Sequence, residues 1–136
     1  MRRNNVIAGL VLTAGALAAF ATPASAGQWH PTPGCARDIS SATTQLGLLD
    51  YNLEVLHFTH YTTPADLVSS QIGDTVDATN TANCAPLARV QVLFRAAEAK
   101  LNDGLAIARA GGSDAAIVEQ VDQAIALYDR AEAIAG

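Results

Sequence analysis

The sequence lacks the short motifs that identify most catalytic and cofactor sites. It contains no Gly-x-Ser-x-Gly elbow, no Cys-x-x-Cys-His motif, no phosphate-binding glycine loop and no calcium-binding loop. These absences argue against a serine hydrolase, a covalently attached haem, a nucleotide site and a calcium site. No constellation of residues points to a reaction, and we therefore expect a non-enzymatic protein.

Basic residues are also scarce. Eight lysines and arginines stand against 13 aspartates and glutamates, which gives a formal net charge of −5. Beyond residue 26 the basic residues stand singly, at Arg37, Arg89, Arg95, Lys100, Arg109 and Arg130. Because no basic stripe is available to neutralise phosphates, we expect neither a nucleic acid nor an anionic membrane surface as a partner. The acidity favours solubility outside the cell.

Runs of β-branched residues are absent, whereas alanine is frequent and glycine and proline gather at a few positions. This composition favours helices over strands. The residues from 27 to 136 suffice for one domain and are too few for two. We therefore predict an all-α domain.

The first 26 residues have the pattern of a cleavable secretory signal. Arg2 and Arg3 precede an apolar run from Val6 to Phe20, and Ala-Ser-Ala at 24–26 offers a small-residue cleavage site. The run is too short to cross a bilayer as a helix. We predict a signal peptide over 1–26 and a secreted or extracytoplasmic product that does not associate with membranes after cleavage.

Only two cysteines are present, Cys35 and Cys84. In an exported chain an even pair predicts one intramolecular disulfide, which would close a loop of about 50 residues and contribute about 4 kcal/mol. A disulfide-linked dimer and two free thiols are the alternatives, because one sequence does not show connectivity.

Apolar residues at helical spacing predict four helices, over about 35–61, 64–81, 86–110 and 114–134. Thr63 and Ser113 are suitable N-caps for the second and fourth helices. Residues 27–34 contain two prolines and are expected to form an extended lead-in to a helical domain over 35–136. Short turns between helices indicate an up-down-up-down four-helix bundle, which places the starts of the first and third helices, and hence both cysteines, at the same end.

The first predicted helix carries two apolar stripes. One consists of Ile39, Ala42, Leu46, Leu49, Leu53 and Leu56, and the other of Leu48, Tyr51, Val55 and Phe58. The two stripes lie roughly 160–200° apart at the helical angle of about 100° per residue. Burial of both, with this helix between neighbours, is the favoured interpretation because small domains need every apolar stripe for their core. Alternatively, the second stripe is exposed and binds a partner protein, a small apolar ligand or a second copy of the chain.

Glu54, His57, His60 and Tyr61 form the one concentrated polar cluster, at the end of this helix. Imidazole and phenolate groups ligate iron, so the cluster could hold a metal ion or haem. In the simpler interpretation it is a frayed helix end whose histidines interact with the helix dipole. The sequence thus predicts an exported binding or interaction protein of unknown ligand, with a secreted haem or metal carrier as the alternative.

Overall fold

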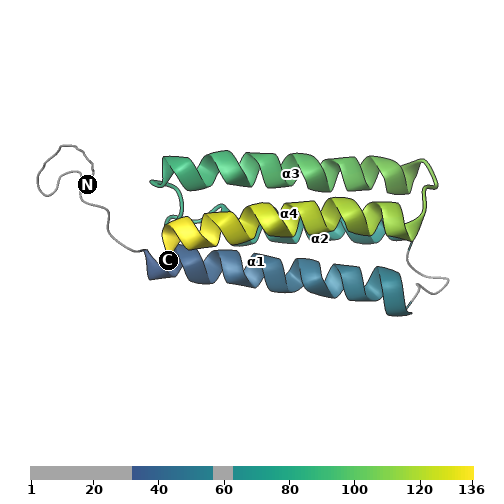
Figure 1. Cartoon of the computed structure of the whole chain (residues 1–136), viewed down its shortest axis with the longest axis horizontal. Helices are drawn as coiled ribbons and strands as arrows, with labels where there is room; N and C mark the ends of the chain where they lie inside the picture. Colours follow the sequence, from purple (N-terminus) through teal and green to yellow (C-terminus); the bar gives the residue numbers. More distant parts are fainter. Residues whose placement is uncertain (1–31, 57–62) are drawn as a thin grey trace, which may run out of the picture. The chain divides into compact units, whose positions relative to one another are not determined.

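The computed structural model describes residues 32–56 and 63–136, and every regular element in these two ranges is helical. Figure 1 shows the helices lying side by side. They are α1 (Pro33–Tyr51), the π-helix η2 (Asn52–Leu56), α2 (Pro64–Thr79), α3 (Ala88–Arg109) and α4 (Asp114–Ala135). The predicted all-α class is confirmed. None of the described helices combines the length and hydropathy of a membrane span. The predicted signal peptide lies outside the described residues.

α1 begins earlier and ends sooner than the sequence pattern predicts. Its first residue is Pro33, which corrects the predicted extended lead-in at residues 33 and 34. Proline is well suited to the first helical turn, where its missing N–H leaves no bond unmade. At the other end, the regular α-helix stops at Tyr51 and continues as one π turn over Asn52–Leu56. The rest of the predicted helix, 57–61, lies outside the described residues.

Side-chain caps fix the starts of α2 and α4. Thr63 Oγ1 accepts a hydrogen bond of 3.1 Å from the backbone N–H of Asp66, and Ser113 Oγ accepts one of 3.1 Å from that of Ala116. Each hydroxyl thereby pairs one of the N–H groups that a helix leaves free at its first turn. Both predicted caps are confirmed, and α3 runs unbroken through Gly104, as its apolar register predicts.

The hydrophobic core lies between the four α-helices, with α3 against α4, α1 against α4 and α2, and α2 against α3. Phe94 of α3 and Tyr128 of α4 meet in the core with their ring centroids 5.6 Å apart. α2 contributes the least apolar surface, since its fully buried residues are Val68 and two threonines, Thr75 and Thr79. α2 is therefore held mainly by a small apolar face and by the turns at its ends.

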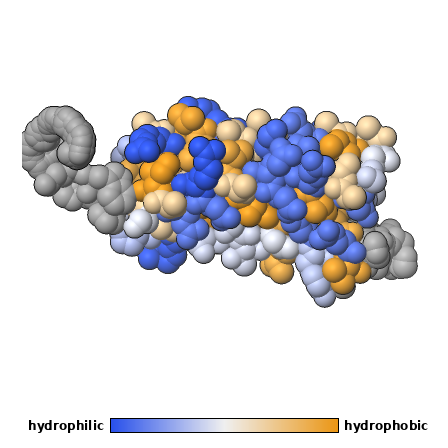
Figure 2. Space-filling view, in the orientation of Figure 1, coloured by the Kyte–Doolittle hydropathy of each residue, from blue (hydrophilic) through white to orange (hydrophobic). Residues whose placement is uncertain are grey.

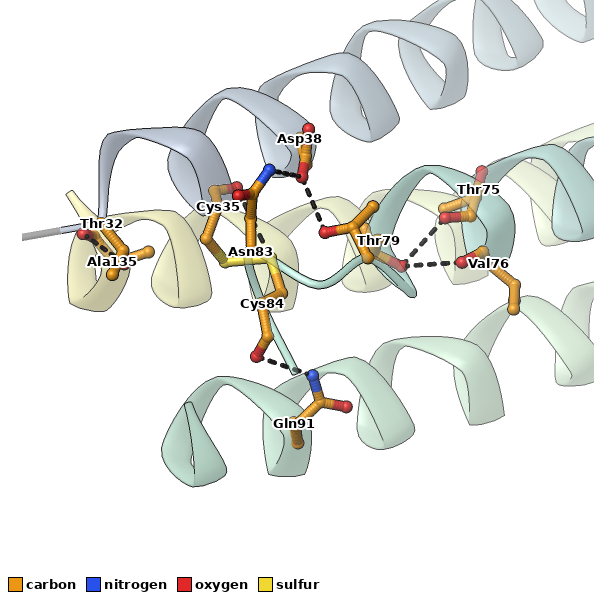
Figure 3. The surroundings of a disulfide bond; sticks show 11 residues. Thr32, Cys35, Asp38, Thr75, Val76, Thr79, Asn83, Cys84, Gln91 and Ala135 are labelled. Atoms are coloured by element: carbon orange, nitrogen blue, oxygen red, sulfur yellow. Dashed lines mark hydrogen bonds between the residues drawn. A yellow bond between two sulfur atoms is a disulfide. The ribbon is translucent and has the colours of Figure 1, made fainter. Parts of the chain in front are cut away.

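A disulfide joins Cys35, in the first turn of α1, to Cys84, in the turn before α3 (Figure 3). Both cysteines are fully buried, and neither is a free thiol. Close by, Asp38 accepts hydrogen bonds from Thr81 Oγ1 at 2.7 Å and from Asn83 Nδ2 at 3.1 Å. The intramolecular pairing predicted from the sequence is confirmed, and the alternatives of free thiols and an intermolecular bond are wrong.

The end of α4 also meets the start of α1. The backbone N–H of Thr32 donates a hydrogen bond of 2.9 Å to the carbonyl oxygen of Ala135. Gln91 Nε2 of α3 donates to the carbonyl oxygen of Cys84 at 3.0 Å. The disulfide therefore lies in a region where α1, α3, α4 and the turn after α2 are all linked.

Candidate interaction surface on the first helix

α1 has one buried face and one exposed apolar face. Ile39, Ala42, Leu46 and Leu49 are buried and face the core. On the opposite side Leu48, Tyr51 and Val55 are 56%, 50% and 55% exposed, and we call these three residues the α1 stripe. The favoured sequence interpretation, with both stripes buried, is therefore wrong. α1 packs mainly against α2 and α4, and none of the described helices covers its second stripe.

Phe58 was predicted to extend this stripe, but it lies outside the described residues. In the described part of the chain the α1 stripe therefore ends at Val55. Leu56 belongs to the predicted core stripe, and its side chain is likewise outside the description.

The exposed side of α1 is unusually free of charge. From Ser40 to Leu49 the helix contains no charged residue at all. Its exposed positions in this stretch are Ser40, Ser41, Thr44, Gly47 and Leu48. Figure 2 shows the result as pale and hydrophobic residues along α1, whereas strongly hydrophilic residues gather over α3 and α4. Exposed helix faces in soluble proteins are normally rich in charge, so an uncharged face with large apolar residues indicates a contact surface.

Two threonine hydroxyls on or beside this face already have partners. Thr44 Oγ1 donates a hydrogen bond of 2.9 Å to the carbonyl oxygen of Ser40 within the helix, and Thr43 Oγ1 donates to the same oxygen at 3.0 Å. A partner that covered Thr44 would therefore leave the hydroxyl donor of this threonine paired. A Cβ atom placed on Gly47 would meet nothing within 4 Å, so the backbone is open to close approach there.

Beneath the end of the stripe, two carboxyl groups meet across the interface between α1 and α4. Burial, a hydrogen bond with Asp122 and the negative charges of Asp122 and Glu54 together raise the pKa of Asp50 to about 8, and burial is the largest cause. Ionised carboxylates only accept hydrogen bonds, so this pair holds a proton when it is bonded. The second oxygen of Asp50, Oδ1, is buried and has no hydrogen-bond partner in the described part of the chain.

Sequence reasoning missed the Asp50 and Asp122 pair. The available signal was the position of each aspartate beside a buried apolar residue, Leu49 in α1 and Val121 in α4. It also missed the uncharged stretch from Ser40 to Leu49, although this feature is readable directly from the sequence. The absence of charge marks a surface in contact with something, but it does not show whether a neighbouring helix or another molecule covers that surface.

The predicted metal or haem cluster is only partly described. Glu54 is exposed in η2, next to the α1 stripe, whereas His57, His60 and Tyr61 lie outside the described residues. Among the residues that are described, no group of three or more histidine, cysteine, aspartate or glutamate side chains is placed to hold a metal ion. Binding of a metal or haem by this cluster stays a prediction.

No protein-family model, curated protein or solved structure matches this chain. Its function is therefore inferred from the geometry and chemistry of its own residues. The α1 stripe is the described feature for which the bundle itself gives no explanation, since it adds nothing to the core.

Proposed function

We propose that this protein is an exported, non-enzymatic binding protein, and that the α1 stripe is its docking surface. The observation that carries the proposal is the half-exposed state of Leu48, Tyr51 and Val55, which lie at and beyond the end of the uncharged stretch from Ser40 to Leu49. Full burial of a large apolar side chain from water contributes about 1.5–3 kcal/mol, and these side chains, which are about half exposed, forgo roughly half of that each. A partner that covered them would recover part of that free energy.

Two features support the scaffold in this proposal. The segment over 1–26 has the pattern of a signal peptide, and a fully buried disulfide suits an oxidising compartment. An up-down-up-down order of the helices is supported by the bond between Cys35 and Cys84 and by the hydrogen bond between Thr32 and Ala135. In that order the disulfide end is fixed, and the α1 stripe occupies the other half of α1.

Val92 on α3 shows what an ordinary exposed apolar residue looks like in this chain. It is 57% exposed, as much as any residue of the α1 stripe. However, the exposed charged residues Arg89 and Arg95 lie one turn before and after it. Single apolar residues among charges are normal on protein surfaces. Val92 is therefore a matched control for experiments on the α1 stripe.

Site-specific photo-crosslinking in cells that produce the protein tests the proposal. A benzophenone amino acid replaces Tyr51 in one variant and Val92 in the control. We expect discrete adducts from position 51 and none from position 92, because only the first lies on a docking surface. The absence of adducts at 51, or the same adducts at both positions, would show that the α1 stripe is not a docking surface.

A further inference from the structure

The side chains on the exposed side of α1 increase in size along the helix. Its first half presents the small residues Ser41 and Thr44, and its second half presents the large residues of the α1 stripe. From Ser41 to Tyr51 these positions follow one another at spacings of three, four and three residues, and exposed Val55 follows in the π turn. In a helix this spacing keeps them on one side, opposite the core.

Opposite charges mark the two ends of this side. Arg37 is exposed and lies four residues before Ser41, and Glu54 is exposed and lies next to Val55. Other acids of α1 are occupied elsewhere. Asp38 accepts hydrogen bonds from Thr81 and Asn83, and Asp50 lies half-buried against Asp122 of α4. The exposed side of α1 thus has a positive start, an uncharged middle and a negative end.

We propose that the partner of the α1 stripe is a second copy of this chain, bound through the same surface in an antiparallel, two-fold arrangement. This inference rests on the proposed function and names the occupant of its docking surface. In an antiparallel pair centred near residue 46, Tyr51 lies over Ser41 of the second copy and Leu48 over its Thr44. The same register brings Arg37 to Glu54 of the second copy.

Three properties favour a second copy over another partner. The large half of each helix fits against the small half of the other, which lets two helices approach to the usual 8–10 Å. The charged ends become opposite pairs, and two-fold symmetry forms each pair twice. In addition, the middle of this surface carries no charge, so two copies of this acidic chain, each with a net charge of −5, can meet here without facing like charges.

Sedimentation of the purified, oxidised protein over a range from about 1 μM to 1 mM tests this pairing, since a dimer held by one helix pair is expected to be weak. We expect a reversible monomer–dimer equilibrium. Tyr51→Asp should raise the dissociation constant at least about tenfold, because it places a charge in the apolar part of the contact. Val92→Asp, at an equally exposed position outside the stripe, should leave the constant unchanged.

Charge reversal tests the antiparallel register separately. Arg37→Glu and Glu54→Arg should each weaken the dimer, because each replaces an attraction by a repulsion between the two copies. The double variant should restore dimerisation close to the original level. Both positions are exposed, so the helical circular dichroism of the variants should match that of the original protein. Failure of the double variant to restore the dimer overturns this register.

The outcomes also separate the inference from the proposed function. A protein that stays monomeric up to about 1 mM, or a dimer that is indifferent to Tyr51→Asp, overturns self-association through α1. In that case the mass of the adduct crosslinked at position 51 decides the docking function. An adduct with a different protein keeps the docking surface and contradicts the second copy, whereas the absence of any adduct overturns the docking surface as well.

Discussion

Asp50 is the residue whose surroundings most oppose its usual charge state. Burial, followed by the hydrogen bond with Asp122 and the repulsion from Asp122 and Glu54, raises its pKa from 3.8 to about 8. A carboxyl group with a raised pKa in the folded state holds its proton more tightly there than in the unfolded chain. The folded state therefore loses stability as the pH rises from about 4 to about 8, and the loss is complete above that range.

We expect Asp50→Asn to remove this loss. The amide is uncharged at every pH and can donate a hydrogen bond to the Asp122 carboxylate. Above pH 8 the variant should be more stable than the original protein by about 1–2 kcal/mol. This value allows for the solvent screening of a half-exposed group. Near pH 4 the two proteins should be equally stable. Urea unfolding between pH 4 and pH 9 measures it. The control is Asp129→Asn, at an exposed aspartate of α4. If the unfolding free energy of Asp50→Asn depends on pH as that of the original protein does, the expectation is wrong.

At the scale of single residues, the sequence predicted the caps and the disulfide but not the carboxyl pair. Thr63 and Ser113 each cap the helix turn that follows them, so their roles can be predicted from the adjacent residues of the sequence. The residue of α4 that faces Asp50 is set instead by how the two packed helices are rotated about their axes and shifted along them. Neither quantity is encoded in the periodicity of one helix.

At the scale of elements, helix positions followed from the sequence to within two residues for α2, α3 and α4. Strong caps, prolines and the glycines at 111 and 112 mark these boundaries. The π turn at Asn52–Leu56 was not predicted, because one widened turn barely changes the apolar spacing. The two stripes of α1 were identified, but spacing does not reveal whether a neighbour covers a stripe. That depends on the position of α1 in the bundle.

α2 offers a test of how much backbone freedom weakens its helix. Gly73 is exposed in the interior of α2, and a Cβ atom there would meet nothing within 4 Å. Gly73→Ala should therefore stabilise the protein by about 0.5–1 kcal/mol in urea unfolding, because alanine restricts the unfolded chain and favours helix.

The matched control for this substitution is Gly111→Ala. That position is equally open, but its φ of +78° is unfavourable for any residue with a side chain. The control should lose about 1 kcal/mol, because the left-handed conformation strains alanine. If both substitutions stabilise the protein, or if neither does, the backbone conformation of the glycine does not determine the change in stability.

At the scale of the whole described bundle, stability is unevenly supported. All four helices share the core, but the links between turns gather near the disulfide, at Thr32, Asp38, Asn83 and Gln91 (Figure 3). The sequence predicted this end because helix order and cysteine positions agreed. The hydrogen bonds around it were not predictable, since they depend on the path of the turn after α2. Loss of the disulfide should therefore lower the stability of the bundle strongly.

We expect the double variant Cys35→Ala, Cys84→Ala to lose about 4 kcal/mol of unfolding free energy, because the bond closes a loop across a sequence separation of 49 residues. For a domain of this size such a loss lowers the Tm by about 15–25 °C. Thermal unfolding with and without reductant measures it. Reductant should bring the original protein to the level of the variant and leave the variant unchanged. A loss below about 1 kcal/mol would mean that the hydrogen bonds of Thr32, Asp38 and Gln91 hold this end without the sulfur bond, since such bonds contribute about 1 kcal/mol each.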